Sequence, residues 1–175
     1  MVRQTTRQLV ELSLYAALMI ISVQFLRIPV GAQFVHIGNA LVAVAVLLYG
    51  SKLGVLVAAI GLGLFDVLNG YAAVAWITIL ESLIVCLVLH LVFEKLLRAD
   101  KQMRNVVIVG GVAALTKIIS NLIKYTIINS LVGGVSIEAA VAAAVVKIGG
   151  TFGTALVTII AVPILYPILK RIVAR

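Results

Sequence analysis

Two lysines and an asparagine in one apolar stretch are the residues best suited to binding chemistry. In LTKIISNLIKYTIIN, residues 115–129, Lys117, Asn121 and Lys124 fall within an arc of about 60° on a helix that turns by about 100° per residue. Lys147 begins a second face of this kind, which continues through three threonines. A lysine centred in lipid costs several kcal/mol. We therefore expect both faces to point into a bundle interior or a wet cavity.

The acids available to these lysines are few. Asp66 and Glu81 are the only carboxylates that we expect inside the membrane, against three lysines. One interpretation is that ion pairs hold the helices together, with Glu81 as a lysine partner rather than a ligand contact. The surplus of lysine favours a polar cavity, because a buried ammonium group without a carboxylate needs water or a ligand.

Catalytic motifs are missing from the sequence. The chain has no G-x-x-x-x-G-K-[ST] phosphate loop, no H-E-x-x-H and no G-x-S-x-G. His36 and His90 are expected on opposite sides of the membrane, and Cys86 has no second cysteine to pair with. We therefore predict a protein that is not an enzyme, with no cofactor or metal in this chain.

Composition indicates the elements that must position these residues. Hydrophobic residues make up 63% of the chain, charged residues 11%, and mean hydropathy is +1.25, which predicts an integral membrane protein. The apolar runs are too long and too uniform for a β-barrel. We predict an all-α fold, a compact bundle of six transmembrane helices with a short third helix, in a single domain spanning 1–175. The expected helices are 8–27, 38–50, 53–68, 72–97, 105–132 and 139–169.

The distribution of basic residues predicts the orientation. Six spans put both termini on one side of the membrane. The basic residues of the two termini and of the 95–104 loop fall on that side, together with Lys52, whereas only Arg27 falls on the other. The positive-inside rule then places both termini in the cytoplasm. Basic loops beside anionic lipid account for the net charge of +8, so no nucleic-acid partner is expected.

Depth in the membrane predicts where a solute binds. The outer ends of the helices converge with the loops RIPVGAQFVHIGN and DVLNGY, which suits a small polar or aromatic solute. Trp76 could stack on it, or be an ordinary interfacial aromatic residue, and His36 could be a satisfied loop histidine. The predicted substrate-binding residues are His36, Asn39, Asp66, Asn69, Trp76, Asn121, Lys124 and Lys147.

The stretch FVHIGNALVAVAVLLYGSKLGVLVAAIGLGLFDVLNGYAAVAWITI resembles the S components of energy-coupling factor (ECF) vitamin transporters. The similar subgroup includes carriers of pyridoxine or hydroxymethylpyrimidine and riboflavin-type proteins. The resemblance implies a subunit in a bacterial plasma membrane that captures a vitamin at its outer side. It implies as partners a transmembrane coupling subunit and two cytoplasmic ATPases, which would hold ATP and magnesium. Pyridoxine or hydroxymethylpyrimidine is favoured, with riboflavin, pantothenate or a self-sufficient channel or carrier as alternatives.

Two pairs of small residues could mediate helix packing. The family carries a small-x-x-x-small pattern on the first helix as its contact with the coupling subunit, and the nearest match here is Ser13 and Ala17. The alternative is that both pack inside the bundle. Gly149 and Gly153 form a second pair, which we expect to serve packing within the bundle.

Overall fold

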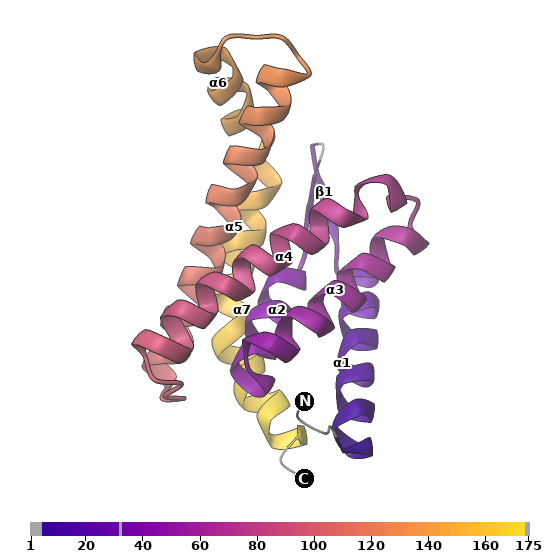
Figure 1. Cartoon of the computed structure of the whole chain (residues 1–175), viewed down its shortest axis with the longest axis vertical. Helices are drawn as coiled ribbons and strands as arrows, with labels where there is room; N and C mark the ends of the chain where they lie inside the picture. The colour runs from indigo at the N-terminus through magenta and orange to yellow at the C-terminus, as the bar shows by residue number, and fades with distance from the viewer. Residues whose placement is uncertain (1–4, 32, 174–175) are drawn as a thin grey trace.

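The computed structural model describes residues 5–31 and 33–173, and helices dominate it (Figure 1). The helices are α1 (Thr6–Phe25), α2 (Gly38–Tyr49), α3 (Ser51–Leu68), α4 (Ala75–Leu89), α5 (Met103–Leu131), α6 (Ile137–Lys147) and α7 (Gly149–Val173). A short 3-10 helix, η1 (Ala72–Val74), precedes α4, and a π-helix, η2 (His90–Leu96), follows it. The start of α1 and the end of α7 lie at the same end of the molecule (Figure 1).

Five helical segments are long and apolar enough to cross a membrane: α1, α3, the continuous run Ala72–Leu96, α5 and α7. This agrees with the prediction of an all-α membrane protein. The predicted count of six helices differs from the structure, which has seven α-helices within the described residues. The two shortest α-helices, α2 and α6, have 12 and 11 residues and are not among the five segments long enough to cross a membrane.

The prediction of a short third helix is wrong. Helix α3 has 18 residues, and the short element is α2 before it. The chain turns between them at Gly50, whose φ of +82° suits glycine, so α3 begins directly at Ser51. Nearly every residue of α2 is buried, which is typical of a helix that is apolar on all sides and central to a fold.

The predicted sixth helix, 139–169, is divided in two. Helix α6 starts at Ile137 and ends at Lys147, and it is capped by Ser136, whose side chain accepts a hydrogen bond from the backbone N–H of Ala139. Helix α7 starts at Gly149, and two successive glycines weaken a continuous helix there because glycine has low helix propensity. Lys147 and the threonines after it therefore lie on different helices, so the predicted continuous face is also wrong.

A β-hairpin occupies part of the segment that we expected to be a loop. Strands β1 (Ile28–Val30) and β2 (Gln33–Val35) pair antiparallel, with Pro29 opposite Phe34. The hairpin packs on the start of α7, where a Cβ at Gly150 would come within 2.7 Å of the Gln33 side chain and one at Gly153 would overlap Val35. Both glycines are thus needed for close approach. The predicted pair was Gly149 and Gly153, but a Cβ at Gly149 would meet open space.

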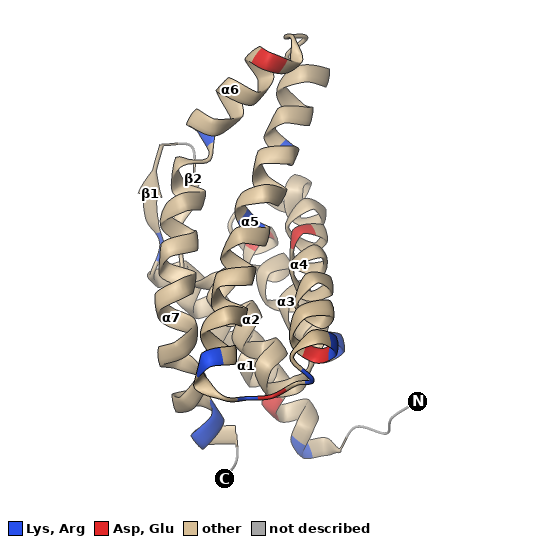
Figure 2. Ribbon diagram, turned by 90° about the vertical axis from the view of Figure 1, so that its left-hand side faces the viewer, with Lys and Arg blue, Asp and Glu red and all other residues tan. Residues whose placement is uncertain are grey.

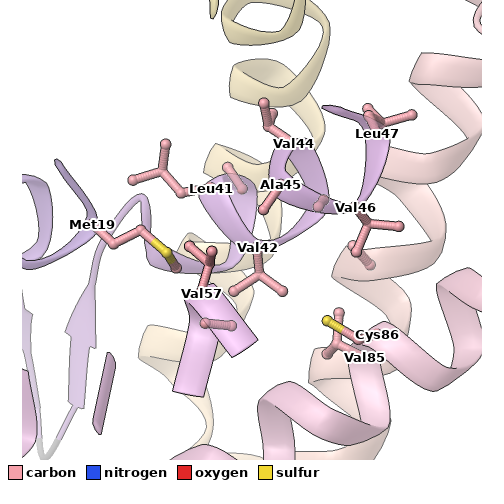
Figure 3. Close-up of a cluster of buried hydrophobic side chains, with 14 of the residues drawn as sticks. Met19, Leu41, Val42, Val44, Ala45, Val46, Leu47, Val57, Val85 and Cys86 are labelled. Carbon is pink, nitrogen blue, oxygen red and sulfur yellow. The ribbon is translucent and has the colours of Figure 1, made fainter. Parts of the chain in front are cut away.

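The hydrophobic core surrounds α2 (Figure 3). Met19 of α1, Val57 of α3 and Val85 of α4 are almost completely buried in it. Cys86 lies beside Val85 and is fully buried, as expected of a small packing residue (Figure 3). Near its start, α2 is also tied to α1, because the Tyr15 hydroxyl donates a 2.8 Å hydrogen bond to the Leu41 carbonyl.

Lys and Arg residues gather mainly at the end of the bundle where α7 ends and α5 begins (Figure 2). The opposite end, where α6 and the hairpin lie, carries few charged residues along the ribbon (Figure 2). The structure thus preserves the charge asymmetry on which the predicted orientation depends.

Candidate functional site

A cavity of about 270 Å³ lies at the end of the bundle away from the start of α1 and the end of α7. It forms where the last turns of α1 and α3, the first turns of α2, α4 and α7, the middle of α5 and the hairpin meet. The side chains in its lining that can donate or accept hydrogen bonds are Arg27, Gln33, His36, Asn39, Asp66, Tyr71, Thr78, Glu81, Ser82, Lys117, Asn121, Lys124, Tyr125, Thr151 and Thr154. Polar and ionisable side chains gathered among membrane-spanning helices are typical of substrate sites.

An ionic cluster joins α4 to α5 in the wall of this cavity. One carboxylate oxygen of Glu81 accepts a hydrogen bond from Lys117 and the other accepts one from Lys124. All three side chains are mostly buried. The predicted common face of the two lysines and the role of Glu81 as a lysine partner are confirmed. Two ammonium groups against one carboxylate leave the cluster with a net charge of +1.

A chain of hydrogen bonds joins α5, α7 and the hairpin. The Asn121 amide donates to the Thr151 hydroxyl at 2.8 Å, and the Thr151 backbone N–H donates to the Gln33 side-chain oxygen at 2.9 Å. Gln33 in turn donates to the Tyr125 hydroxyl at 3.3 Å. The side-chain oxygen of Asn121 is buried and has no hydrogen-bond partner within the described residues. Asn121 is thus held through its amide N–H group, while its side-chain oxygen is left buried and unsatisfied.

His36 and Asn39 line the cavity where α2 begins. The Nδ1 atom of His36 accepts a 3.0 Å hydrogen bond from the Gly38 backbone N–H, so a neutral His36 carries its proton on Nε2. Asn39 donates to the Ala113 carbonyl and to the Thr158 hydroxyl, each at 3.2 Å. Both side chains therefore hold the cavity wall together as well as forming its surface.

Asp66 and Asn69 lie on neighbouring turns at the end of α3 but differ in role. Asp66 lines the cavity, is 8% exposed, and its Oδ2 atom has no hydrogen-bond partner in the described part of the chain. Asn69 lies outside the lining. Its amide donates to the Phe65 carbonyl at 2.9 Å and its side-chain oxygen accepts from Arg27 at 3.3 Å. Asn69 therefore helps to hold the cavity residue Arg27 in place without lining the cavity itself.

Trp76 and Lys147 also lie outside the cavity lining. Trp76 is 63% exposed, and its indole N–H donates to the Ala73 carbonyl at 3.1 Å. Lys147 is exposed at the end of α6, with its ammonium nitrogen 4.7 Å from the centre of the Tyr125 ring. Lys124 lies 4.6 Å from the same ring. The structure thus brings five of the eight predicted binding residues to the cavity and leaves Asn69, Trp76 and Lys147 outside it.

Several lining residues were missed by the sequence analysis. The Arg27 guanidinium carbon lies 5.1 Å from the ring centre of Phe34 in the hairpin and 5.4 Å from that of Phe65 in α3. Its Nη1 atom is buried with no hydrogen-bond partner among residues 5–31 and 33–173. The sequence did single out Arg27, because it is the one basic loop residue expected on the outer side of the membrane. Gln33 and Phe34 gave no comparable signal, because they reach the cavity only through the hairpin.

Ser13 and Ala17 lie on the outer surface of α1, where both are exposed next to the exposed Leu14 and Leu18. The alternative that they pack inside the bundle is therefore wrong. Buried contacts of α1 are made by the residues between them, Tyr15 and Ala16.

Comparison with known proteins identifies the family. The family model described as "ECF-type riboflavin transporter, S component" matches residues 3–171. No curated protein was found to match the chain. The matched family consists of transporter components rather than enzymes. Because the match covers almost the whole chain, this protein belongs to the family of S components of ECF-type transporters, which serve vitamin uptake.

Proposed function

We propose that this chain captures a heteroaromatic vitamin in the 270 Å³ cavity and delivers it to an ECF-type importer. The observation that carries the proposal is the polar cavity itself, which is lined by an ion cluster and by residues with unsatisfied acceptors, among helices suited to a membrane. Beneath it the core around α2 is tightly packed. Because the cavity ends on a packed core, a solute can enter and bind but has no open path through the protein. This favours a substrate-binding subunit over a channel or a self-sufficient carrier.

The lining supports a ligand with an aromatic ring and several polar substituents. Lys117 and Lys124 retain N–H donors beyond those given to Glu81, while Asn121 and Asp66 supply acceptors. Phe65 adds an apolar ring surface. Riboflavin is the first candidate because the matching family model is described for it. Pyridoxine and hydroxymethylpyrimidine, which the sequence favoured, present similar ring nitrogens and hydroxyls. Pantothenate is the main alternative, because its carboxylate would pair with the net positive charge of the Glu81 cluster.

Uptake would need partners, as the family implies. A coupling subunit and two ATPases would supply the energy from ATP with magnesium, since this chain has no phosphate-loop motif. The exposed small residues Ser13 and Ala17 would allow a helix of the coupling subunit to approach α1 closely. The charge asymmetry supports cytoplasmic termini in a bacterial plasma membrane, with the cavity on the outer side.

Titration calorimetry on the detergent-purified chain tests this function, with riboflavin, pyridoxine, hydroxymethylpyrimidine and pantothenate as ligands. We expect tight binding of one heteroaromatic vitamin. Lys124→Met should weaken it by roughly 10- to 150-fold, because a charged hydrogen bond is worth about 1.5–3 kcal/mol. The exposed Lys101→Met is the matched control and should bind like the parent.

Two results would contradict the proposal. If Lys124→Met is monodisperse and binds as tightly as the parent, then the lysine is structural and the ligand lies elsewhere. If the purified chain alone sustains vitamin flux into liposomes, it is a channel or carrier rather than a capture subunit.

A further inference from the structure

A second concave surface lies between α4 and α5 on the outside of the bundle. It encloses about 680 Å³ and is separate from the cavity described above. We call it the α4–α5 groove, and its lining residues are Trp76, Ile77, Leu80, Glu81, Ile84, Val88, Val112, Leu115, Thr116, Ile119, Ser120, Ile123, Lys124, Ile127 and Ile128. Figure 1 shows α4 leaning away from α5 toward the end that carries α6. Most of the apolar residues in the lining are exposed.

We propose that the α4–α5 groove binds one acyl chain of a phospholipid from the leaflet on the cavity side. Its length fits such a chain. Trp76 and Val88, at its two ends, are twelve residues apart on α4, which is about 18 Å at 1.5 Å per residue. One leaflet contributes about 15 Å of a 30 Å hydrocarbon core. Trp76, of a residue type enriched where membrane meets water, lies at the end where a headgroup would sit.

Of the five polar side chains in the groove, four are already paired and Ser120 is the exception within the described residues, which favours a hydrocarbon occupant over a polar one. The Thr116 hydroxyl donates to the Val112 carbonyl at 2.8 Å, and the Trp76 indole donates to Ala73. Glu81 and Lys124 bond to each other. A methylene chain therefore covers the groove without leaving these groups unsatisfied.

Glu81 and Lys124 line the cavity as well as the groove. These two side chains are therefore part of the partition between them. A chain seated in the groove packs against the apolar stem of Lys124 and closes the cavity on its membrane side.

Fluorescence of Trp76, the single tryptophan of the sequence, provides the test. Phosphatidylglycerol brominated in the part of the acyl chain next to the headgroup is titrated into the purified protein in maltoside detergent, with total lipid held constant by unbrominated lipid. We expect saturable quenching at about one lipid per protein. Ser120→Phe and Ile123→Phe fill the groove from α5 and should each weaken this quenching at least tenfold. Leu156→Phe, on the exposed surface of α7, should leave it unchanged.

Quenching that rises in proportion to the brominated fraction without saturation would overturn the proposal, as would equal quenching in the parent and both groove variants. Folding of each variant is checked by the protection of buried Cys86 from thiol reagents. The experiment needs no vitamin. A chain that quenches saturably but binds no vitamin would refute the proposed function and leave the lipid site standing.

Discussion

Replacing Glu81 with glutamine is expected to destabilise the folded protein more than replacing either lysine of its cluster. Glu81 is the shared acceptor of Lys117 and Lys124, and its side chain is 9% exposed. Glutamine keeps the shape and removes the charge, so two buried ammonium groups lose their carboxylate. Lys124→Met leaves Glu81 paired with Lys117 and removes the excess positive charge.

The expected magnitude follows from this asymmetry. Breaking a buried ion pair by removing one partner costs about 3–5 kcal/mol, and here the lost partner serves two cations. For a chain of this length, about 1 kcal/mol corresponds to roughly 2–4 °C in Tm, so Glu81→Gln should lower Tm by about 6–20 °C. Lys124→Met should change Tm much less. The triple variant Glu81→Gln, Lys117→Met, Lys124→Met contains no charge in the cluster and should recover most of the loss.

Thermal unfolding of the ligand-free protein in detergent can be followed with a thiol-reactive dye, because Cys86 is fully buried and is the single cysteine of the chain. The reasoning is refuted if Glu81→Gln melts within about 2 °C of the parent. It is also refuted if Lys124→Met melts as low as Glu81→Gln, since the cost would then not depend on which partner is lost.

Three further outcomes are expected. Gly153→Val should displace the hairpin because the new side chain meets Val35, so proteolysis within 28–35 should accelerate and vitamin affinity should fall. Gly149→Ala, whose new methyl group meets open space, should change neither. Ser13→Leu should abolish uptake by the assembled transporter yet leave the affinity of the isolated chain within about threefold, because bulk blocks close helix approach; unchanged uptake would move the contact elsewhere. In a Cys86→Ala background, a cysteine at Lys101 should react with an impermeant reagent only after cells are permeabilised, and labelling of intact cells would reverse the proposed orientation.

The sequence alone determined the properties that depend on local periodicity and composition. Long apolar runs require helices in a membrane, since backbone groups must be satisfied within each segment. The spacing of Lys117, Asn121 and Lys124 places them on one face whatever surrounds the helix, and the structure confirms that this face lines the cavity. Residues at the ends of several predicted helices, such as Asp66, reached the same cavity as expected.

Tertiary structure decided what depends on packing between distant segments. The hairpin forms and docks because Gly150 and Gly153, more than a hundred residues later, leave room for it, so no local pattern could reveal that Gln33 reaches the cavity. The rotation of α4 about its axis turns Glu81 inward and Trp76 outward, and a helix's rotation is set by its neighbours. The choice of Glu81 rather than Asp66 as partner of both lysines follows from the same packing, because an ion pair needs two helices to present their charges at one height and distance.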